Sequence, residues 1–506
     1  MIKNAGDTTA ETSETIVLSR KEYEKLLSDN EYLKQQLAEL KRMIFGSKRE
    51  RFVPSGTSGA EQLSLFGTPQ ENAPQQETEE ITYTRTKQTS KKKQIPVRAA
   101  LPAHLPRVEE VIEPDNIKEG AKKIGEEVTE ILEYNPSELF VRKIIRPKYA
   151  LPQDSGVVIG ELPTLPIPKG NAGPGLLSHI LVSKFIDHLP FYRLIKMIAR
   201  QGVVISDSTF NGWFNAAVDL ITPLYDVLKE ELLQSDYIQA DESPIGVQDK
   251  QKKGKLHQGY QWVFRSPEKG LVLFKYNKSR KREAAEDILQ GFTGTLQTDG
   301  YTVYQNLRVK GNITLLGCMA HARRYFEKAL DNDKRRGEQA MIMFQKLYKT
   351  ERKCRDLNLF HEARKEMRQS EAKPVLDEFK EFLAENISVV PPKSAIGKAV
   401  NYTSNLWPNL ERYIEDGKYE IDNNMIENTI RPLALGRKNY LFAGSHKAAQ
   451  RAAVMYSFFA TCKVNDVEPF AWLKDVLTRI PDHKANKLHE LLPAQWKKAQ
   501  EQAPAH

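Results

Sequence analysis

The sequence predicts a multidomain protein of mixed α/β class, and three observations carry this prediction. The chain has 506 residues, more than one hydrophobic core normally holds. Its apolar fraction of 40% and charged fraction of 28% are those of a globular protein. Between residues 235 and 330, short apolar runs typical of strands alternate with amphipathic stretches typical of helices.

Composition also excludes several classes of protein. No run of eighteen or more apolar residues occurs, so no membrane span is expected. The polar N-terminus lacks the apolar core of a secretory signal, which predicts a cytoplasmic protein. Cys318, Cys354 and Cys462 are too few and too widely spaced for a disulfide framework. The net charge of +9 is in the direction expected of a nucleic-acid binder, although a mildly basic enzyme would carry the same charge.

Residues 19–46 have the heptad pattern of a coiled coil. Its a positions hold Tyr23, Asn30, Leu37 and Ile44, and its d positions hold Leu26, Leu33 and Leu40. An asparagine at one a position favours a parallel pair in fixed register, so we expect a homodimer through this segment. The alternative is a helix that packs on its own chain.

Two segments of different composition follow the heptads. Residues 54–95 are rich in Gln, Glu, Thr, Ser and Gly, which bury too little apolar surface to order a chain, so we expect a flexible linker. Residues 96–168 contain short apolar alternations such as LFVRKIIRPKYAL. These alternations predict a small β-rich module.

Residues 175–222 predict three helices. Pro190 begins the second helix, Gly202 ends it, and Ser206 or Asp207 caps the third. Two helices joined by a short turn fit a helix-turn-helix, in which Ser208, Thr209 and Asn211 would face DNA. A helical hairpin without a DNA role has the same outline, and Trp213 is expected in the core.

The next part of the chain carries three acids at positions where chemistry is expected. Residues 235–330 predict three antiparallel strands, a helix, a strand ending at Asp299, a further strand and a basic helix, with Asp241 on the first strand. Glu427 lies on a later helix within residues 419–465. This order predicts a ribonuclease-H-like α/β domain in which the three carboxylates converge at the sheet edge.

The gap between the second and third acids is too long for a simple connection. Residues 331–418 have helical periodicity throughout, so we expect an all-α insertion there. Residues 466–506 predict a C-terminal tail of small helices.

Three carboxylates suit one kind of chemistry. Mg²⁺, or Mn²⁺ in its place, takes hard oxygen ligands and keeps open positions, so Asp241, Asp299 and Glu427 would hold two ions. Two such ions activate an attacking oxygen and stabilise the leaving oxygen during displacement at phosphorus.

The motifs around these acids resemble those of the large transposase subunit of the insertion-sequence-66 family, and the resemblance covers nearly the whole chain. The motifs are DESPIGV, QTDGYTVY, GCMAHARRYF and NNMIENTIRPLALGRKNYLFAGS. The resemblance implies a DDE transposase whose catalytic triad matches Asp241, Asp299 and Glu427. It also implies metal-dependent cleavage and strand transfer at terminal inverted repeats, target DNA as a second substrate, and accessory proteins of the same element.

One departure from the family concerns zinc. Relatives usually carry a cysteine-rich zinc-binding module before the helix-turn-helix, whereas residues 96–168 here contain no cysteine. We therefore expect no zinc in this chain.

Several further side chains are candidates for supporting roles. Glu242 adjoins Asp241, but adjacent strand residues face opposite sides, so only one of them enters the site. We expect Cys318 and His321 to pack near the acids or to support them. Phosphate contacts are expected from basic residues that follow the acids, with a solvated face as the alternative for the first two: Arg323, Arg324, Arg431, Arg437 and Lys438. Arg431 shares a helical face with Glu427, so the two could instead form an ion pair.

The sequence thus predicts a DNA transposase of a bacterial insertion sequence. Two alternatives stay open: a transposase-derived DNA-binding regulator without catalysis, and a structure-specific DNA nuclease that hydrolyses without joining.

Overall fold

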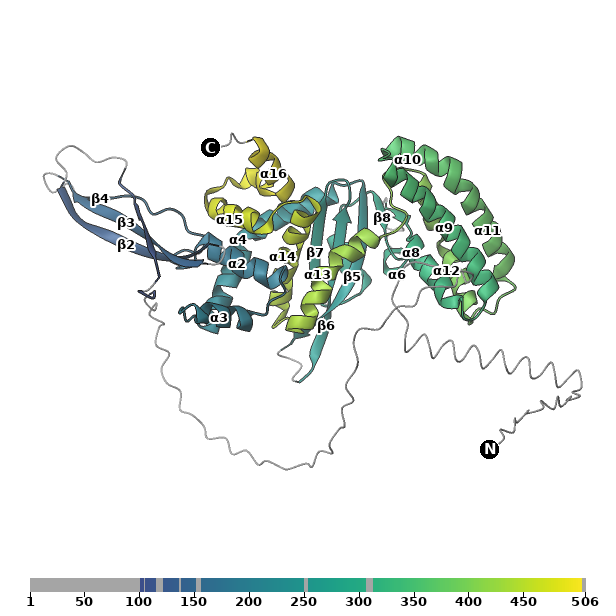
Figure 1. The fold of residues 1–506 in the computed structure, drawn as a ribbon, viewed down its shortest axis with the longest axis horizontal. Coiled ribbons are helices and arrows are strands. Elements are labelled where there is room, and N and C mark those ends of the chain that lie inside the picture. The colour runs from purple at the N-terminus through teal and green to yellow at the C-terminus, as the bar shows by residue number, and fades with distance from the viewer. Residues whose placement is uncertain are drawn as a thin grey trace, which may run out of the picture.

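The structure is a computed structural model that describes residues 101–103, 105–114, 122–135, 138–151, 156–249, 254–305 and 313–502. The predicted coiled coil and linker lie outside these residues. The described chain has a mixed α/β architecture with two sheets (Figure 1). Within these residues, no helix combines the length and the apolar character needed to cross a membrane.

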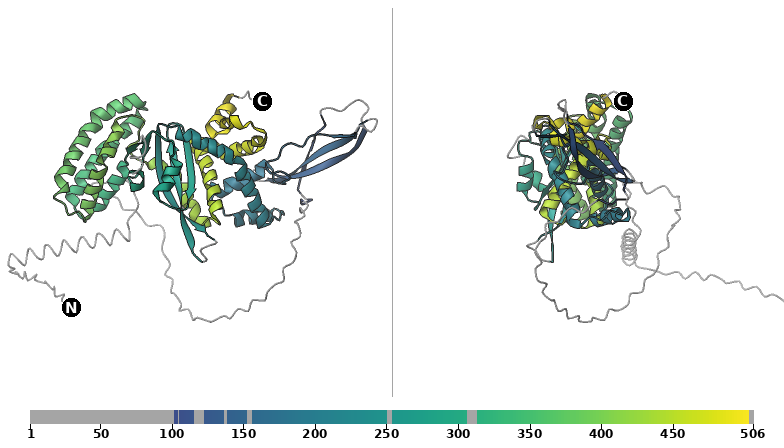
Figure 2. Two further views of the ribbon diagram at one scale, coloured as in Figure 1. Left: turned by 180° about the vertical axis from the view of Figure 1, so that it is seen from behind. Right: turned by 90° about the vertical axis from the view of Figure 1, so that its left-hand side faces the viewer.

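The first sheet lies within residues 96–168, where the sequence predicts a β-rich module. Strands β2 (Lys122–Asn135) and β3 (Glu138–Ala150) form an antiparallel ribbon. Strand β1 (Arg107–Val111) pairs with β3 in parallel, and β4 (Val157–Ile159) pairs with it antiparallel. The ribbon projects from one end of the molecule (Figures 1 and 2).

Three helices follow the first sheet: α2 (Pro174–Phe185), α3 (Phe191–Arg200) and α4 (Asp207–Leu233). Ser206 is the N-cap of α4, because its hydroxyl accepts a hydrogen bond from the backbone N–H of Thr209 at 3.1 Å. Gly202 follows α3 with a φ of 85°, a left-handed conformation that glycine adopts without strain. Trp213 is buried, as expected of a core residue.

The central sheet has five strands in the order β7-β6-β5-β8-β9. Strands β5 (Tyr237–Gln248), β6 (Leu256–Ser266) and β7 (Leu271–Asn277) form an antiparallel meander. Strand β8 (Thr295–Gln297) is parallel to β5, and β9 (Thr314–Leu316) is parallel to β8. Three antiparallel strands are thus followed by two parallel ones.

Helices cover both faces of the central sheet (Figures 1 and 2). Two adjacent residues of β6 point to opposite faces of the sheet and contact helices there. Gln261 donates to the carbonyl of Ala449 on α14 (His446–Val464), and Trp262 packs against Tyr304 on α6 (Thr302–Gln305). Helix α13 (Asn424–Tyr440) lies beside α14, and α5 (Arg282–Ile288) contacts α6. Helix α8 (Met319–Ala329) follows β9.

Residues 331–418 are mainly helical and form a bundle at the end of the sheet opposite the β2–β3 ribbon (Figure 1). We call its elements the insertion helices: α9 (Lys334–Asp356), α10 (His361–Met367), the π-helical turn η2 (Arg368–Ala372), α11 (Lys373–Ile387), α12 (Ala395–Leu410) and the 3₁₀ turn η3 (Glu411–Ile414). Their hydrophobic core also contains Tyr237 of β5 and Leu316 of β9. The insertion helices are therefore packed onto the sheet and not merely tethered to it.

The C-terminal segment packs on the side of the molecule away from the insertion helices (Figure 1). It contains α15 (Pro469–Arg479), two 3₁₀ turns, η4 (Ile480–Asp482) and η5 (Ala485–Leu491), and α16 (Pro493–Gln502). Trp472 is fully buried, and its indole N–H donates to the carbonyl of Leu491 at 2.9 Å. This bond fixes η5 against α15.

Candidate active site

Three different elements deliver the predicted acids. Asp241 lies within β5, Asp299 lies two residues after β8, and Glu427 lies in the first turn of α13. Burial raises the pKa of Asp241 to about 8, and the negative charges of Glu242, Asp299 and Glu427 add to this rise. The structure therefore brings the three acids within electrostatic reach of one another.

Glu242 faces the opposite layer from Asp241, as strand alternation predicts. Its carboxylate forms an ion pair with Arg280 and accepts a hydrogen bond from the hydroxyl of Tyr304 at 3.0 Å. Burial raises the pKa of Glu242, although its bond to Arg280 opposes this effect. Glu242 thus already has partners that neutralise its charge.

Glu427 pairs with an arginine that precedes it by about one hundred residues. Arg324 of α8 donates to its Oε2 at 2.7 Å. The other oxygen, Oε1, is buried and has no hydrogen-bond partner among the residues that the structure describes. A buried carboxylate oxygen without a partner is costly, so this atom is a natural place for a cation to bind.

Cys318 and His321 lie next to Glu427. His321 Nδ1 is 3.2 Å from Cys318 Sγ, and His321 Nε2 is 3.8 Å from Glu427 Oε1. The backbone N–H of Asn423, the N-cap residue of α13, donates to Cys318 Sγ at 3.4 Å. These two side chains therefore link α8 to the start of α13.

The described residues contain no group of three or more His, Cys, Asp or Glu side chains that are already close enough to hold a metal ion. The chemistry of the donors nevertheless fits a hard divalent cation, because three carboxylates share one region and Glu427 Oε1 lacks a partner.

A tight turn follows Asp299. Gly300 has a φ of 87°, and a Cβ added to it would lie 2.4 Å from Leu406 Cδ1 on α12. Asp299 Oδ1 accepts a hydrogen bond from the backbone N–H of Tyr301 at 2.9 Å, which fixes the carboxylate. The turn thus holds Asp299 against the insertion helices.

Gly300→Ala should lower the free energy of unfolding by about 1–2 kcal/mol, because alanine is strained at positive φ and crowds Leu406. Urea unfolding measures this change. Gly212→Ala is the control, since that exposed site on α4 has open space around it and should gain up to about 1 kcal/mol. A neutral Gly300→Ala variant would show that the turn tolerates a side chain.

Candidate DNA contacts on α4 lie at its exposed N-terminal end. Ser208 and Thr209 side chains contact the Ser206 hydroxyl at 2.9 Å, and Asn211 donates to the carbonyl of Asp207 at 2.7 Å. All three predicted residues are exposed, but local bonds already engage their polar groups.

The basic residues of α13 point in different directions. Arg431 is exposed and lines a cavity of about 640 Å³ together with Phe185 and Lys463. Arg437 donates to the carbonyl of Pro244 on β5, and Lys438 is exposed. The sequence left open an ion pair between Arg431 and Glu427. In the structure, Glu427 pairs instead with Arg324 from another helix.

A family model described as Transposase IS66 family matches residues 169–451, a range that contains Asp241, Asp299 and Glu427. The chain belongs to this family. Two further IS66-related models match as well: the IS66 C-terminal element over residues 457–494, and a region described as Transposase C of IS166 homeodomain over residues 32–109. These matches support a transposase role.

Similar proteins occur in Sinorhizobium fredii. The uncharacterized protein y4hP is 30% identical over 92% of this chain and 89% of its own length. The uncharacterized protein y4jD is 34% identical over 78% of this chain and 81% of its own length. The resemblance to the IS66 family that the sequence motifs indicated is confirmed.

One basic surface of this IS66 family chain was not predicted from the sequence. Arg280, Lys281 and Arg282 line a cavity of about 460 Å³ together with Tyr301, two residues after Asp299. The guanidinium of Arg280 lies over the Tyr301 ring, 4.1 Å from its centroid. The run KSRKR at residues 278–282 was the available signal, but only the fold places it beside an acid.

Proposed function

We propose that the protein is a DDE transposase that cleaves DNA at terminal inverted repeats and joins the freed ends to target DNA. Asp241, Asp299 and Glu427 are its catalytic acids. The observation that carries this proposal is the convergence of these three carboxylates from β5, the turn after β8, and α13, where Asp299 and Glu427 both raise the pKa of half-buried Asp241. Such an accumulation of partly buried negative charge favours binding of a cation.

The topology of the central sheet supports a ribonuclease-H-like catalytic domain. An antiparallel meander is followed by two parallel strands on the far side of β5, in the order β7-β6-β5-β8-β9. Residues Tyr237 to Gln239 of β5 pair with Thr295 to Gln297 of β8, so Asp241 and Asp299 each follow this paired segment by two residues. The insertion helices interrupt the domain between α8 and α13.

The three carboxylates would hold Mg²⁺ or Mn²⁺, and two bound ions would supply an activated oxygen nucleophile and a stabilised leaving oxygen. The chain prepares the site for these ions. Arg324 keeps Glu427 turned toward α8 at 2.7 Å, and His321 lies 3.8 Å from its second oxygen. The positive charge of Arg324 stabilises the carboxylate before it binds metal.

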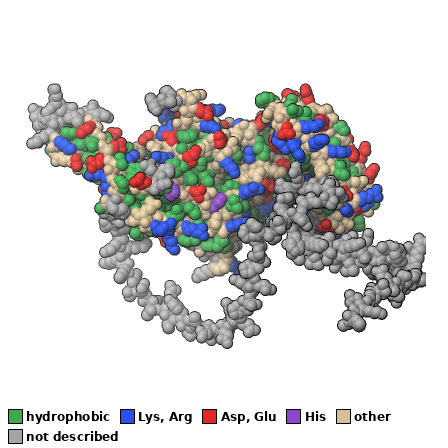
Figure 3. Space-filling model, viewed as in Figure 1, with side chains coloured by type: hydrophobic (Ala, Val, Ile, Leu, Met, Phe, Trp, Pro, Cys, Tyr) green, Lys and Arg blue, Asp and Glu red, His purple; other side chains and the backbone are tan. Residues whose placement is uncertain are grey.

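Basic surfaces near the acids suit the DNA backbone. The run Arg280, Lys281 and Arg282 lies beside Tyr301, which follows Asp299 by two residues. Figure 3 shows Lys and Arg side chains gathered at the lower edge of the molecule, over α3 and the C-terminal end of α13. Exposed basic residues on these helices are Arg193, Lys196, Arg200 and Lys438. We propose that α3 and α4 bind the transposon ends as a helix-turn-helix, and that residues 19–46 pair two protomers so that both ends are held.

The test uses a plasmid that carries the DNA flanking the reading frame on both sides. Wild-type protein with Mg²⁺ should cleave at the boundaries and produce joined products. Asp241→Asn should cleave at least about a thousandfold more slowly, because it removes several kcal/mol of transition-state stabilisation. Asp377→Asn, an exposed acid on α11, is the matched control and should retain activity.

Three results would contradict the proposal. Cleavage without joined products indicates a nuclease. Binding without metal-dependent cleavage indicates a regulator. Equal activity of wild type and Asp241→Asn would remove Asp241 from the catalytic site.

A further inference from the structure

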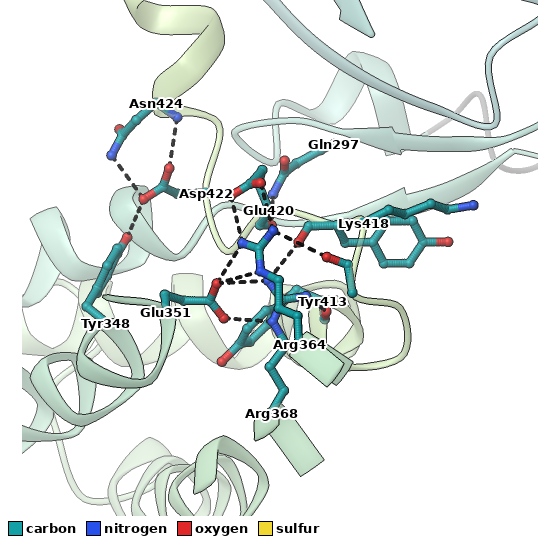
Figure 4. A network of polar contacts seen from close by, with 12 residues as sticks. Gln297, Tyr348, Glu351, Arg364, Arg368, Tyr413, Lys418, Glu420, Asp422 and Asn424 are labelled. Carbon is teal, nitrogen blue, oxygen red and sulfur yellow. Dashed lines mark hydrogen bonds and ion pairs between the residues drawn. The ribbon is translucent and has the colours of Figure 1, made fainter. Parts of the chain in front are cut away.

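Residues 415–423 connect the insertion helices to α13, and a buried arginine holds this segment in place (Figure 4). Arg368 of η2 is fully buried and donates to both oxygens of buried Glu351 at 2.7 and 2.9 Å. Its remaining donors bind the carbonyls of Tyr413, Asp416 and Tyr419 at 2.8 to 2.9 Å. One guanidinium therefore fixes the path of the connecting backbone.

A second arginine extends this contact toward the acids. Arg364 of α10 donates to Glu351 at 2.7 Å and binds both oxygens of Glu420 at 3.0 Å. Bidentate arginine–carboxylate pairs restrict geometry more than single contacts do. Glu420 lies four residues before the beginning of α13, so its position influences where that helix starts.

The same short segment is held from the sheet side as well (Figure 4). Gln297 of β8 donates to the carbonyl of Glu420 at 2.7 Å, and Gln239 of β5 donates to the carbonyl of Asp422 at 3.2 Å. Tyr348 of α9 donates to the Asp422 carboxylate at 2.7 Å. Glu427 lies in the helical turn that follows directly, so the insertion helices and the sheet together set its position.

The insertion helices also reach the second acid. The hydroxyl of Tyr402 on α12 donates to the backbone carbonyl of Asp299 at 2.5 Å. The Tyr402 ring stacks on Tyr325 of α8, with ring centroids 4.3 Å apart. Leu406, one turn further along α12, lies against Gly300. Helix α12 is therefore attached to the turn that carries Asp299.

We propose that the insertion helices act as a brace that sets the separation of Asp299 and Glu427, with Tyr402 and Arg364 as positioning residues. The inference rests on the proposed function, since it concerns the metal-binding geometry of those acids. One end of the brace holds the Asp299 backbone, and the other holds the segment that leads to Glu427. A shared hydrophobic core makes the helices between these ends a single packed unit.

The physical reason for a brace is the precision that a two-ion site requires. Ligands must lie within about 0.5 Å of their productive positions. Asp299 and Glu427 come from different elements separated by the whole insertion, so local backbone geometry alone does not fix their distance. A rigid unit that is attached near both acids can fix the distance between them.

The experiment removes one attachment at a time with the smallest possible change. Tyr402→Phe removes a hydroxyl, and Arg364→Lys keeps the charge but loses the bidentate contact with Glu420. Tyr325→Phe is the matched control for the first, and Lys353→Ala, from an exposed ion pair on α9, is the control for insertion stability. Calorimetric titration of the DNA-free full-length protein with Mn²⁺ measures metal affinity. Three further measurements run in parallel: the cleavage rate as a function of Mg²⁺ concentration, the affinity for transposon-end DNA in EDTA, and thermal unfolding.

The brace predicts that both variants weaken Mn²⁺ binding about five- to tenfold and raise the Mg²⁺ concentration needed for half-maximal cleavage by a similar factor. High Mg²⁺ should restore most of the cleavage rate. The affinity for DNA that carries the transposon ends should stay unchanged. The two control variants should match the wild type in Mn²⁺ affinity.

Lower thermal stability with unchanged Mn²⁺ affinity would overturn the brace, because the contacts would then be only structural. If the wild type binds Mn²⁺ and cleaves DNA, and the Tyr402 and Arg364 variants equal it in Mn²⁺ affinity and cleavage rate, the brace is overturned and the proposed function stands. Wild-type protein that neither binds Mn²⁺ nor cleaves would overturn both.

Discussion

Glu427→Gln should abolish Mg²⁺-dependent cleavage and leave the affinity for transposon ends within about twofold of wild type. The amide keeps the shape of the side chain but loses the charge that a divalent ion requires, which corresponds to at least about a thousandfold in rate. Glu427 pairs with Arg324 on α8 and lies away from the exposed N-terminal end of α4, where end binding is expected. Removing a negative charge near DNA does not weaken phosphate contacts.

Two measurements check this expectation. Gel-shift titration with end DNA in EDTA gives the affinity, and single-turnover cleavage with Mg²⁺ gives the rate. Glu385→Gln changes an exposed acid on α11 and should leave both values unchanged. If Glu427→Gln lowers affinity and cleavage together, the first turn of α13 is a structural element of the DNA-binding surface and not part of a catalytic site.

Much of the central sheet was predictable because local pattern and tertiary pairing agree there. Strand alternation placed Asp241 and Glu242 on opposite layers, and the turn at Gly300 marked the acid that precedes it. The apolar alternation of residues 236–247 predicts one strand, and β5 extends to Gln248 because β6 pairs with it from Gln239 to Gln248.

The partners of the acids were not predictable from sequence. Helical spacing pointed to Arg431 as the neighbour of Glu427, but packing of α8 against the start of α13 brings Arg324 there instead. Glu351, Arg364 and Arg368 have the spacing of ordinary charged residues on insertion helices. Nothing local distinguishes a buried charge network from a solvated helix face, because burial depends on which chain segments pack around it.

Glu351→Gln should cost about 3–5 kcal/mol of unfolding free energy at pH 7, the usual effect of removing one partner from a buried ion pair. Glu351 is fully buried and accepts hydrogen bonds from both Arg364 and Arg368. The glutamine would leave the buried guanidinium of Arg368 without its counter-charge, and Arg364 would keep only its pair with Glu420. Hydrogen exchange of amides in α9 to α12 measures the local stability. Glu371→Gln, which removes an exposed pair with Lys353, should cost less than about 1 kcal/mol.

The effect of Glu351→Gln should also depend on pH, with a defined sign. Burial alone would raise the pKa of Glu351, but the hydrogen bonds and charges of Arg368 and Arg364 outweigh it and hold the pKa below the ordinary value of 4.5. A depressed pKa in the folded state contributes stability above pH 4.5 and loses it as the pH falls through the folded value. The difference between wild type and Glu351→Gln should therefore be constant between pH 6 and 8 and shrink in acid. A difference that stays unchanged at pH 3 would mean that the shape of the Glu351 side chain, and not its charge, stabilises the network.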